Sequence, residues 1–402
     1  MQSRQSAGAG PLDGIRVLDL TSVVLGPLAT QSLADLGADV IKIEGPEGDL
    51  MRANGVSRHP GMSSIYLALN RNKRSVVLDL KTEAGAAALR QLIAGADVFI
   101  HNMRVAAIER LGFGYDAVAA MNPRIVYCVA TGFGQDGPHR DKPAFDDIIQ
   151  AGCGLVSLGA AAGSRPEYVP SLIADKTTGL ALANAVLAAL LHRERHGEGQ
   201  AVEVPMLETM ASFVMAEHLA GLTFDPATGG AGYARLLEGG RRPARTADGW
   251  ICALPYTDRH WQAFFRAVDR EDLATKYNIA SRAERNIHIR ALYQHFGEIT
   301  PDRTTAQWMA LFEALDIPAT PIYTPDELPS HPHLEAVGLF QPTVHPTEGP
   351  LREMRPTARF SATPLALRRH APSLGEHTAE VLREAGLAPC DIDAIAGTPA
   401  AA

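Results

Sequence analysis

The sequence predicts an α/β protein in which helices flank a parallel β-sheet and a second, smaller domain follows. Short β-branched segments alternate with helix-length amphipathic stretches from Gly14 to about Gly132, a pattern typical of parallel sheets. The chain has 402 residues, and a single hydrophobic core stops growing at roughly 250–300 residues. A glycine-rich stretch at about residues 223–247 interrupts the regular pattern. We therefore expect two domains with a junction and a mobile loop in this stretch.

Five β-branched segments are expected to form the first strands of the sheet. Helical patterns at residues 26–36 and 82–94 lie between some of them, so helices can join consecutive strands that run parallel. The five segments are Ile15–Leu20, Asp39–Ile43, Ser75–Leu80, Asp97–Ile100 and Ile125–Ala130.

Further elements are expected along the rest of the chain. An Ala- and Leu-rich segment predicts a long helix from about Thr177 to His196, because Gly197 follows it and cations in its last turn suit the helix dipole. A strand at residues 201–204 should come next. Later helices are expected at residues 258–268, 287–296, 304–315 and 377–385. The expected domain boundaries are 1–222, 223–330 and 331–402.

Composition excludes several classes of partner. The formal net charge is −8 and charged residues make up 20%, so the basic face that nucleic acids require is not expected. The four cysteines lie far apart without CxxC spacing, which favours a reducing compartment and buried thiols. The histidines lack ligand spacing, so no metal site is expected. Met1–Gly10 is polar and no apolar run of about 20 residues occurs, which predicts a soluble, cytoplasmic protein without a membrane partner.

The usual nucleotide and hydrolase motifs are absent from the sequence. A dinucleotide fingerprint needs glycines directly after the first strand, where the backbone approaches a pyrophosphate. That position instead holds Thr21-Ser-Val-Val-Leu-Gly26-Pro27. The sequence also contains no Walker loop, HExxH or GxSxG motif. Nicotinamide, zinc-protease and serine-hydrolase functions therefore lose their main support.

Two acidic positions are compatible with catalysis and with simple helix capping. Asp175 stands just before the expected long helix, where an aspartate commonly serves as the N-cap. A helix N-terminus also holds a carboxylate ionised and oriented, as a carboxylate nucleophile requires. Asp146 and Asp147 begin an expected helix at residues 148–158 and are open to the same two interpretations.

Two basic stretches of the sequence also allow two interpretations each. Lys73 and Arg74 precede an expected strand and form either a solvated turn or an anion site for a phosphorylated cofactor such as CoA. Gly239-Gly240-Arg241-Arg242 is either an exposed basic loop or a lid that seats a carboxylate, since glycine supplies mobility and arginine a bidentate fork.

Taken together, the ordered motifs resemble one family, the CaiB/BaiF (class III) CoA-transferases. The match runs in order over residues 12–210, and a weaker similarity continues from Leu315 to Leu334. The segments that carry it include Thr21–Pro27, Leu33–Glu44, Asn70–Ser75, Leu78–Lys81, Ile108–Tyr115, Gly132–Pro138 and Gly197–Gln200.

This resemblance implies a Rossmann-like large domain built from both chain ends, a smaller α+β domain between them, and two chains interlocked as rings. It implies an enzyme that moves CoA from an acyl-CoA to a small carboxylic acid through an anhydride and a thioester on Asp175, without a metal. Asp146 would support this site and Gly239-Gly240 would cover it, although the family's run of glycines gives way here to Arg241. By position, CoA would contact Ser22, Val23, Val24, Leu25, Asn72, Lys73, Arg74, Asn102, Met103 and Arg110.

A few residues favour particular substrates and a particular reaction. Arg52, Arg241 and Arg242 are candidates for pairing with a distal carboxylate, which favours dicarboxylic acids. The family's racemase branch has a histidine where this chain has Phe145, and epimerisation with two bases needs a titratable group on each face of the substrate. Transfer is therefore favoured over the two alternatives, an acyl-CoA racemase or isomerase and a non-catalytic CoA-binding protein.

Overall fold

The computed structural model describes residues 10–396, which group into two compact units. The first contains the described residues of 1–156, 168–214 and 336–402, and the second contains residues 157–167 and 215–335. Both chain ends thus belong to the first unit. Residues 157–167, 215–222 and 331–335 group with the second unit, whereas the sequence boundaries placed them in the first.

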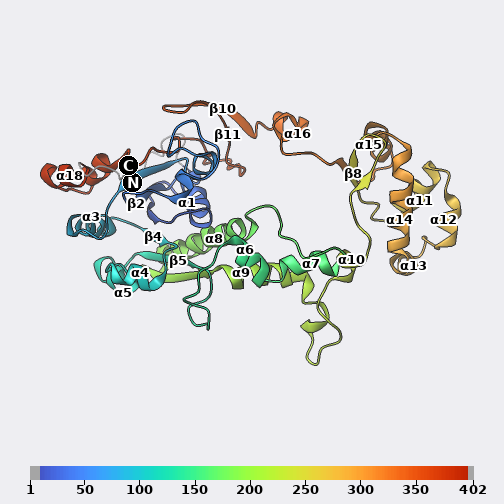
Figure 1. The fold of residues 1–402 in the computed structure, drawn as a ribbon, viewed down its shortest axis with the longest axis horizontal. Helices are drawn as coiled ribbons and strands as arrows, with labels where there is room; N and C mark the ends of the chain where they lie inside the picture. Colours follow the sequence, from blue (N-terminus) through green and yellow to red (C-terminus); the bar gives the residue numbers. More distant parts are fainter. Residues whose placement is uncertain (1–9, 397–402) are drawn as a thin grey trace. The chain divides into compact units, whose positions relative to one another are not determined.

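A six-stranded sheet forms the centre of the first unit, in the order β3-β2-β1-β4-β5-β6 (Figure 1). Every neighbouring pair is parallel, and this order is that of doubly wound, Rossmann-like folds. The expected strands all occur, but β3 begins two residues earlier than expected, at Lys73. The strands are β1 (Arg16–Leu20), β2 (Asp39–Glu44), β3 (Lys73–Val77), β4 (Val98–His101), β5 (Val126–Thr131) and β6 (Gln200–Pro205).

Helices cover both faces of this sheet, as the continuous burial of its central strands requires. Val17 and Leu18 point to opposite faces because successive strand side chains alternate, yet both are fully buried. Helices α1 and α8 pack against each other and the strands, while α3, α5, α17 and α18 join the core of the other face. The helices of this unit are α1 (Leu25–Asp35), α2 (Ser64–Leu69), α3 (Glu83–Ala94), α4 (Val105–Arg110), α5 (Tyr115–Met121), α6 (Asp146–Gly152), α8 (Ile173–His196), α17 (Thr378–Glu384) and α18 (Pro389–Ala396).

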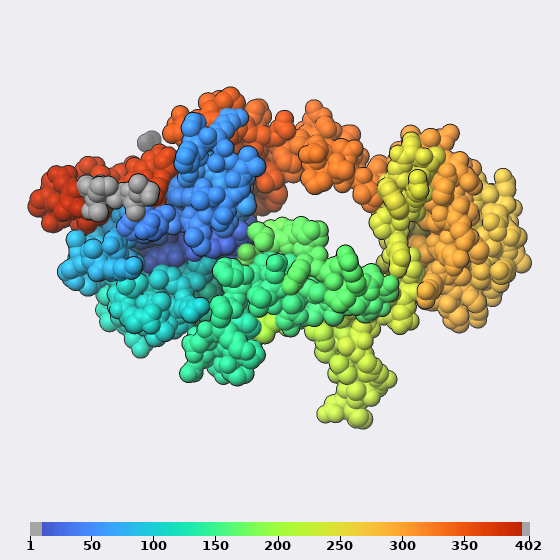
Figure 2. Space-filling view, viewed as in Figure 1, coloured from blue at the N-terminus to red at the C-terminus, as the bar shows by residue number. Residues whose placement is uncertain are grey.

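The C-terminal segment completes the first unit. Figure 2 shows this segment, in red, beside the blue N-terminal part of the chain. Val381 and Leu382 of α17 are buried in the same core cluster as Leu89 of α3. A hairpin of β10 (Phe340–His345) and β11 (Gly349–Met354) precedes it. The packing of α17 on β3 is the reason that both chain ends contribute to one domain.

The second unit has an aromatic core. Trp261, Phe264, Phe296, Trp308 and Phe312 are all buried and stack or meet edge to face. Its antiparallel sheet contains β7 (Ala244–Arg245), β8 (Trp250–Ala253) and β9 (Ala319–Pro321). Its helices are α10 (Ala234–Leu237), α11 (Asp258–Ala267), α12 (Glu271–Lys276), α13 (Arg282–Ile287), α14 (Ile289–Ile299) and α15 (Thr305–Ala314).

The remaining elements connect those described above. These are α7 (Leu155–Ala161), α9 (Met206–His218), α16 (Pro332–Ala336) and the short 3₁₀ helices η1 (Leu50–Arg52), η2 (Ala220–Thr223), η3 (Thr300–Asp302) and η4 (Leu328–Ser330). The single helix expected at residues 148–158 is in fact two, α6 and α7, with Gly154 at positive φ between them.

One sequence expectation about burial is wrong in part. Cys128 and Cys153 are buried, but Cys252 and Cys390 are exposed. Among the described residues, α8 is the one helix whose length and composition suit a membrane span, and half of its most apolar window is buried within the protein. Burial of this extent is typical of a core helix of a soluble protein, so this feature is weak evidence for a membrane.

Candidate active site

A crevice opens at the carboxyl ends of β1 and β4, where the strand order reverses. Ligands of open α/β sheets bind at this position. Ser22 follows β1 and Asn102 follows β4, and the two residues form a pair of hydrogen bonds. The Ser22 N–H donates to Asn102 Oδ1 at 3.0 Å, and Asn102 Nδ2 donates to the Ser22 carbonyl oxygen at 2.8 Å. This pair ties the two strand ends together at the floor of the crevice.

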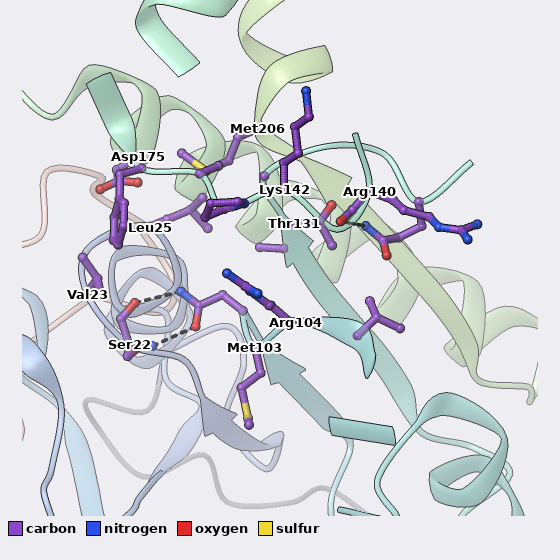
Figure 3. A pocket seen from close by; sticks show the side chains of 18 of the residues that line it. Ser22, Val23, Leu25, Met103, Arg104, Thr131, Arg140, Lys142, Asp175 and Met206 are labelled. Atoms are coloured by element: carbon purple, nitrogen blue, oxygen red, sulfur yellow. Dashed lines mark hydrogen bonds between the residues drawn. The ribbon is translucent and has the colours of Figure 1, made fainter. Parts of the chain in front are cut away.

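A pocket of about 330 Å³ lies over this floor. Figure 3 shows Asp175 and Arg140 on opposite sides of it, with Ser22 and Met103 below. Six of the residues expected to act in catalysis or CoA binding line the pocket, namely Ser22, Val23, Leu25, Asn102, Met103 and Asp175. The sequence prediction is therefore consistent with one shared site for these six.

The turn after β1 is held by buried charges. Val23 has a φ of 72°, a conformation that strains a β-branched residue by about 1–3 kcal/mol. Its N–H donates to Asp49 Oδ1 at 3.0 Å. The other oxygen of Asp49 pairs with Lys42 Nζ at 2.8 Å, and both side chains are fully buried. Lys42 Nζ also donates to the carbonyl oxygen of Thr21 at 2.8 Å, so one ion pair fixes both ends of the turn.

Asp175 does not cap the long helix, because α8 begins at Ile173 and Leu172 is its N-cap residue. Asp175 is the third residue of the first turn, where its backbone N–H has no partner within the helix. That N–H donates to Asp146 Oδ2 at 2.9 Å. Asp146 Oδ1 accepts from Gln150 Nε2 at 2.6 Å. Asp146 therefore binds the start of α8 and places the residue that carries the candidate nucleophile.

The carboxyl group of Asp175 is buried, with 8% of the residue exposed. Burial raises its pKa from 3.8 to about 7, and the neighbouring charge of Asp146 adds to this effect. The sequence interpretation was that the helix terminus keeps this carboxylate ionised, but no cation pairs with it among the described residues. Removal from water outweighs the helix dipole here.

A glycine sets the separation of α8 from α1. A Cβ at Gly179 would lie 2.6 Å from the carbonyl oxygen of Leu25, closer than atoms can approach. Only glycine allows the start of α1 and the second turn of α8 to touch in this way. Gly179 therefore holds Asp175 next to the Val23–Leu25 turn.

The expected contact of Lys73 and Arg74 with CoA is not supported by their positions. Both residues lie in the buried strand β3 and not in a solvated turn. Lys73 Nζ is fully buried, pairs with Asp19 at 3.1 Å, and has a pKa lowered to about 8 chiefly by burial. Arg74 pairs with Asp39, Glu380 and Glu384. Carboxylates of the protein neutralise both charges, so little positive charge remains to bind a phosphate.

Other expected contacts lie away from the pocket. Asn72 is buried and bonded to Asp35 and to the backbone of Arg368. Arg52, expected to bind substrate, is buried against Glu44 at 2.7 Å and lies over the ring of Tyr66. Val24 is the buried N-cap residue of α1, and Arg110 lies exposed at the end of α4. None of these four side chains is part of the pocket lining.

Sequence reasoning missed several residues of the pocket. Arg104 and Lys142 are exposed cations that form no ion pair within residues 10–396, and Arg140 pairs only with the adjacent Asp141. Thr131 and Met206 complete the wall. Lys142 stands four residues before Asp146 in the sequence, and this proximity could have indicated that Lys142 lies near the site.

Gly239, Gly240, Arg241 and Arg242 belong to the second unit. Their approach to Asp175 remains a prediction. A Cβ at Gly239 would lie 2.3 Å from the Arg235 carbonyl oxygen. Gly240 has a positive φ of 69° and packs next to Arg290. Close packing thus accounts for these glycines without a mobile loop. The described residues contain no group of three or more His, Cys, Asp or Glu that could hold a metal ion.

Comparison with known proteins decides the family. Residues 12–378 match the sequence profile of CoA-transferase family III. The chain belongs to CoA-transferase family III. It is therefore an enzyme of this class, and CoA-transferases use CoA thioesters as substrates.

Relatives of this family III CoA-transferase cover nearly the whole chain. The succinate–glutarate CoA-transferase of Agrobacterium fabrum is 33% identical over 93% of this chain and 95% of its own. The succinyl-CoA:mesaconate CoA-transferase of Haloarcula marismortui is 32% identical over 94% and 97%. The crystal structure of Rv3272 from Mycobacterium tuberculosis superposes with a TM-score of 0.80 at 31% identity, covering 92% and 99% of the two chains.

Proposed function

We propose that this CoA-transferase uses Asp175 as the covalent acceptor of acyl groups and of CoA. The observation that supports the proposal is a buried carboxylate without a cation partner, positioned by Asp146 in a pocket at the switch point of the sheet. A desolvated carboxylate is a stronger nucleophile than a hydrated one once it is ionised. A purely structural aspartate would be expected to have a hydrogen-bond donor or cation for its side chain.

The proposed reaction proceeds in balanced steps. A carboxylate oxygen of Asp175 attacks the thioester carbonyl of the donor, the C–S bond breaks, and the CoA thiolate leaves a mixed anhydride. The thiolate attacks the Asp175 carbonyl carbon, the C–O bond breaks, and the donor acid departs as a carboxylate. An aspartyl-CoA thioester remains. The acceptor carboxylate then repeats both steps in reverse, which needs no net proton.

Backbone N–H groups are proposed to stabilise the oxyanions of these steps. The first turn of α1 begins at Leu25, next to Asp175 in the pocket lining. No side chain caps this helix, so its free N–H groups can donate hydrogen bonds to a developing oxyanion. Water must also be excluded because an anhydride hydrolyses, and the loop at Gly239-Gly240 is proposed to serve that purpose.

CoA is proposed to extend from this pocket into its neighbour. A second hollow of about 380 Å³ lies over the ends of β1, β2 and β3 and shares Ser22 and Met103 with the first. The thioester would lie near Asp175 and the nucleotide end in the second hollow. The free cations Arg104 and Lys142 are available for a phosphate or for the acceptor acid.

A small dicarboxylic acid is the proposed acceptor. The names of relatives include glutarate, mesaconate, citramalate and oxalate transferases, although Rv3272 is named a probable fatty acyl-CoA transferase. Unpaired cations in the pocket suit a second carboxylate and do not suit an aliphatic tail. We also propose that the enzyme is a cytoplasmic homodimer.

Asp175→Ala and Asp175→Asn variants test the proposal. With succinyl-CoA and glutarate, transfer should fall by more than about 1,000-fold in both, since each lacks the nucleophile. The wild-type enzyme incubated with succinyl-CoA should give a hydroxamate on the peptide with residue 175 after treatment with hydroxylamine.

Two outcomes would contradict the proposal. Transfer retained near the wild-type rate in either variant would exclude Asp175 as the acceptor. Uptake of deuterium at the α-carbon of an acyl-CoA without any acceptor acid would instead identify a racemase or isomerase. Asp147→Asn, at an exposed position of α6, is the matched control and should transfer normally.

A further inference from the structure

A third cavity, of about 610 Å³, lies wholly within the second unit. It is nearly twice the size of the pocket beside Asp175 at about 330 Å³. The end of α10, the loop that leads into β7, and helix α14 form its walls. Four arginines line it, namely Arg241, Arg242, Arg245 and Arg290.

The positive charge in this cavity is not neutralised by the protein. Glu238 is the one acidic residue among those that line it. None of the four arginines forms an ion pair within residues 10–396. By contrast, the buried Arg285 of the same unit pairs with Asp258. Four guanidinium groups around one hollow repel one another, and a bound anion would relieve that repulsion.

Arg241 provides the most specific evidence. Its Nε is buried and has no hydrogen-bond partner within the described part of the chain. A buried donor without a partner destabilises a protein by about 1–3 kcal/mol. The Arg241 guanidinium also forms a hydrogen bond with the hydroxyl of Tyr293 in the cavity wall. A ligand oxygen that accepts from Nε would satisfy the donor that remains.

The local backbone brings the arginines together. Gly240 takes a left-handed conformation with a φ of 69°, and a Cβ there would lie 3.4 Å from Cγ of Arg290. This glycine lets the loop pass close to α14, so that Arg241 and Arg290 line the same hollow. Arg242 Nη2 donates to the carbonyl oxygen of Ala162 at 3.3 Å, which ties the loop to another wall of the cavity.

We propose that this cavity binds a small anion with two or more negatively charged oxygens, with Arg241 and Arg290 as its main ligands. Guanidinium groups bind carboxylate and phosphate oxygens through paired hydrogen bonds. A free dicarboxylate and the phosphates of CoA share this chemistry. The anion site is supported by residues of the second unit alone. The identification of its occupant as a substrate rests on the proposed function.

Calorimetric titration of the full chain tests the site with three probes, glutarate, inorganic phosphate and adenosine 3′,5′-bisphosphate. At least one should bind at millimolar concentration or below. Arg241→Gln and Arg290→Gln should each weaken that binding by about tenfold or more. Binding of glutarate alone would assign the site to the acid, and binding of the bisphosphate alone would assign it to CoA.

Matched variants make the outcome decisive. Arg282→Gln removes an exposed arginine of α13 outside the cavity and should leave binding unchanged. Arg290→Lys keeps the charge and should retain more affinity than Arg290→Gln, which separates ligand binding from a folding defect. No binding of any probe, or equal binding by wild type and both glutamine variants, would overturn the proposal.

The anion site and the proposed function can fail separately. Asp175→Ala should abolish transfer and leave anion binding intact. An enzyme that transfers CoA through Asp175 but binds no anion in the second unit would refute only the site proposed here.

Discussion

At the scale of single residues, the central feature is the pairing of Asp175 with Asp146. The carboxylate of Asp146 accepts a hydrogen bond from the backbone N–H of Asp175. The carboxylate of Asp175 itself lies in the pocket without a counter-ion. The sequence indicated both acids but not their arrangement, because helix starts differ by a few residues from sequence estimates. Burial of Asp175 beside Asp146 changes its expected ionisation from fully charged to nearly balanced at neutral pH.

This ionisation predicts a pH profile for transfer. Because the pKa of Asp175 is about 7, kcat/KM should rise as pH increases from 6 to 8 and level off once the carboxylate is ionised. Asp146→Asn keeps an oxygen for the Asp175 N–H and removes the neighbouring charge, so the midpoint should move to lower pH. A flat profile in the wild type, measured with a constant donor and acceptor, would contradict the raised pKa.

The same group predicts a pH-dependent stability difference. The folded pKa of about 7 lies above the ordinary value of 3.8, so the folded state binds the extra proton between these values and loses stability as pH rises. Asp175→Asn has no such penalty. It should be more stable than wild type by on the order of 2–4 kcal/mol at pH 8 and equal near pH 4. Chemical unfolding at the two pH values measures the difference, and equal stability at pH 8 would refute the buried ionisation.

At the scale of elements, the β-branched segments predicted the sheet well, since parallel strands buried on both faces are continuous apolar runs. The start of β3 was predicted two residues too late, and this error changed the role expected of two cations. Lys73 and Arg74 appeared to precede the strand, whereas they lie inside it and pair with Asp19 and Asp39. No local pattern indicates that a lysine will be neutralised by an aspartate 54 residues away.

The contact of α1 with α8 gives a prediction at this scale. Gly179→Ala places a methyl group 2.6 Å from the Leu25 carbonyl oxygen, so α8 must shift and Asp175 with it. Transfer should fall at least about tenfold even in folded protein, since a displacement of 1 Å can reduce a rate by about 100-fold. Gly95→Ala, directly after α3, is the control, because its Cβ meets no atom closer than 4.0 Å. Unchanged kcat in Gly179→Ala would show that this separation is unimportant.

At the scale of the whole molecule, the two chain ends form one domain. The resemblance in motifs predicted this arrangement, but composition and periodicity did not, because a sequence pattern carries no information about which distant segments pack together. The structure provides the physical reason in Arg74, a buried residue of β3 that binds Glu380 and Glu384 of the C-terminal helix α17. The interlocked dimer and the covering of Asp175 by Gly239-Gly240 remain predictions.

Arg74→Gln separates this structural role from the CoA contact expected from the sequence. The variant should lose about 1–3 kcal/mol of unfolding free energy, because three carboxylates lose their common partner and those on α17 are partly exposed. Its KM for succinyl-CoA should remain within about twofold of the wild-type value. A large rise in KM with unchanged stability would restore Arg74 as a CoA ligand.

The central claim, that Asp175 is the acyl acceptor, is tested most directly by tracing oxygen during turnover. Each transfer should move one oxygen atom from the acceptor acid to the Asp175 carboxylate and later to the released donor acid. With acceptor acid labelled with the heavy oxygen isotope in ordinary water, mass spectrometry should find the label on the peptide containing residue 175 and in the donor acid. Continued turnover with no label in either would contradict the account.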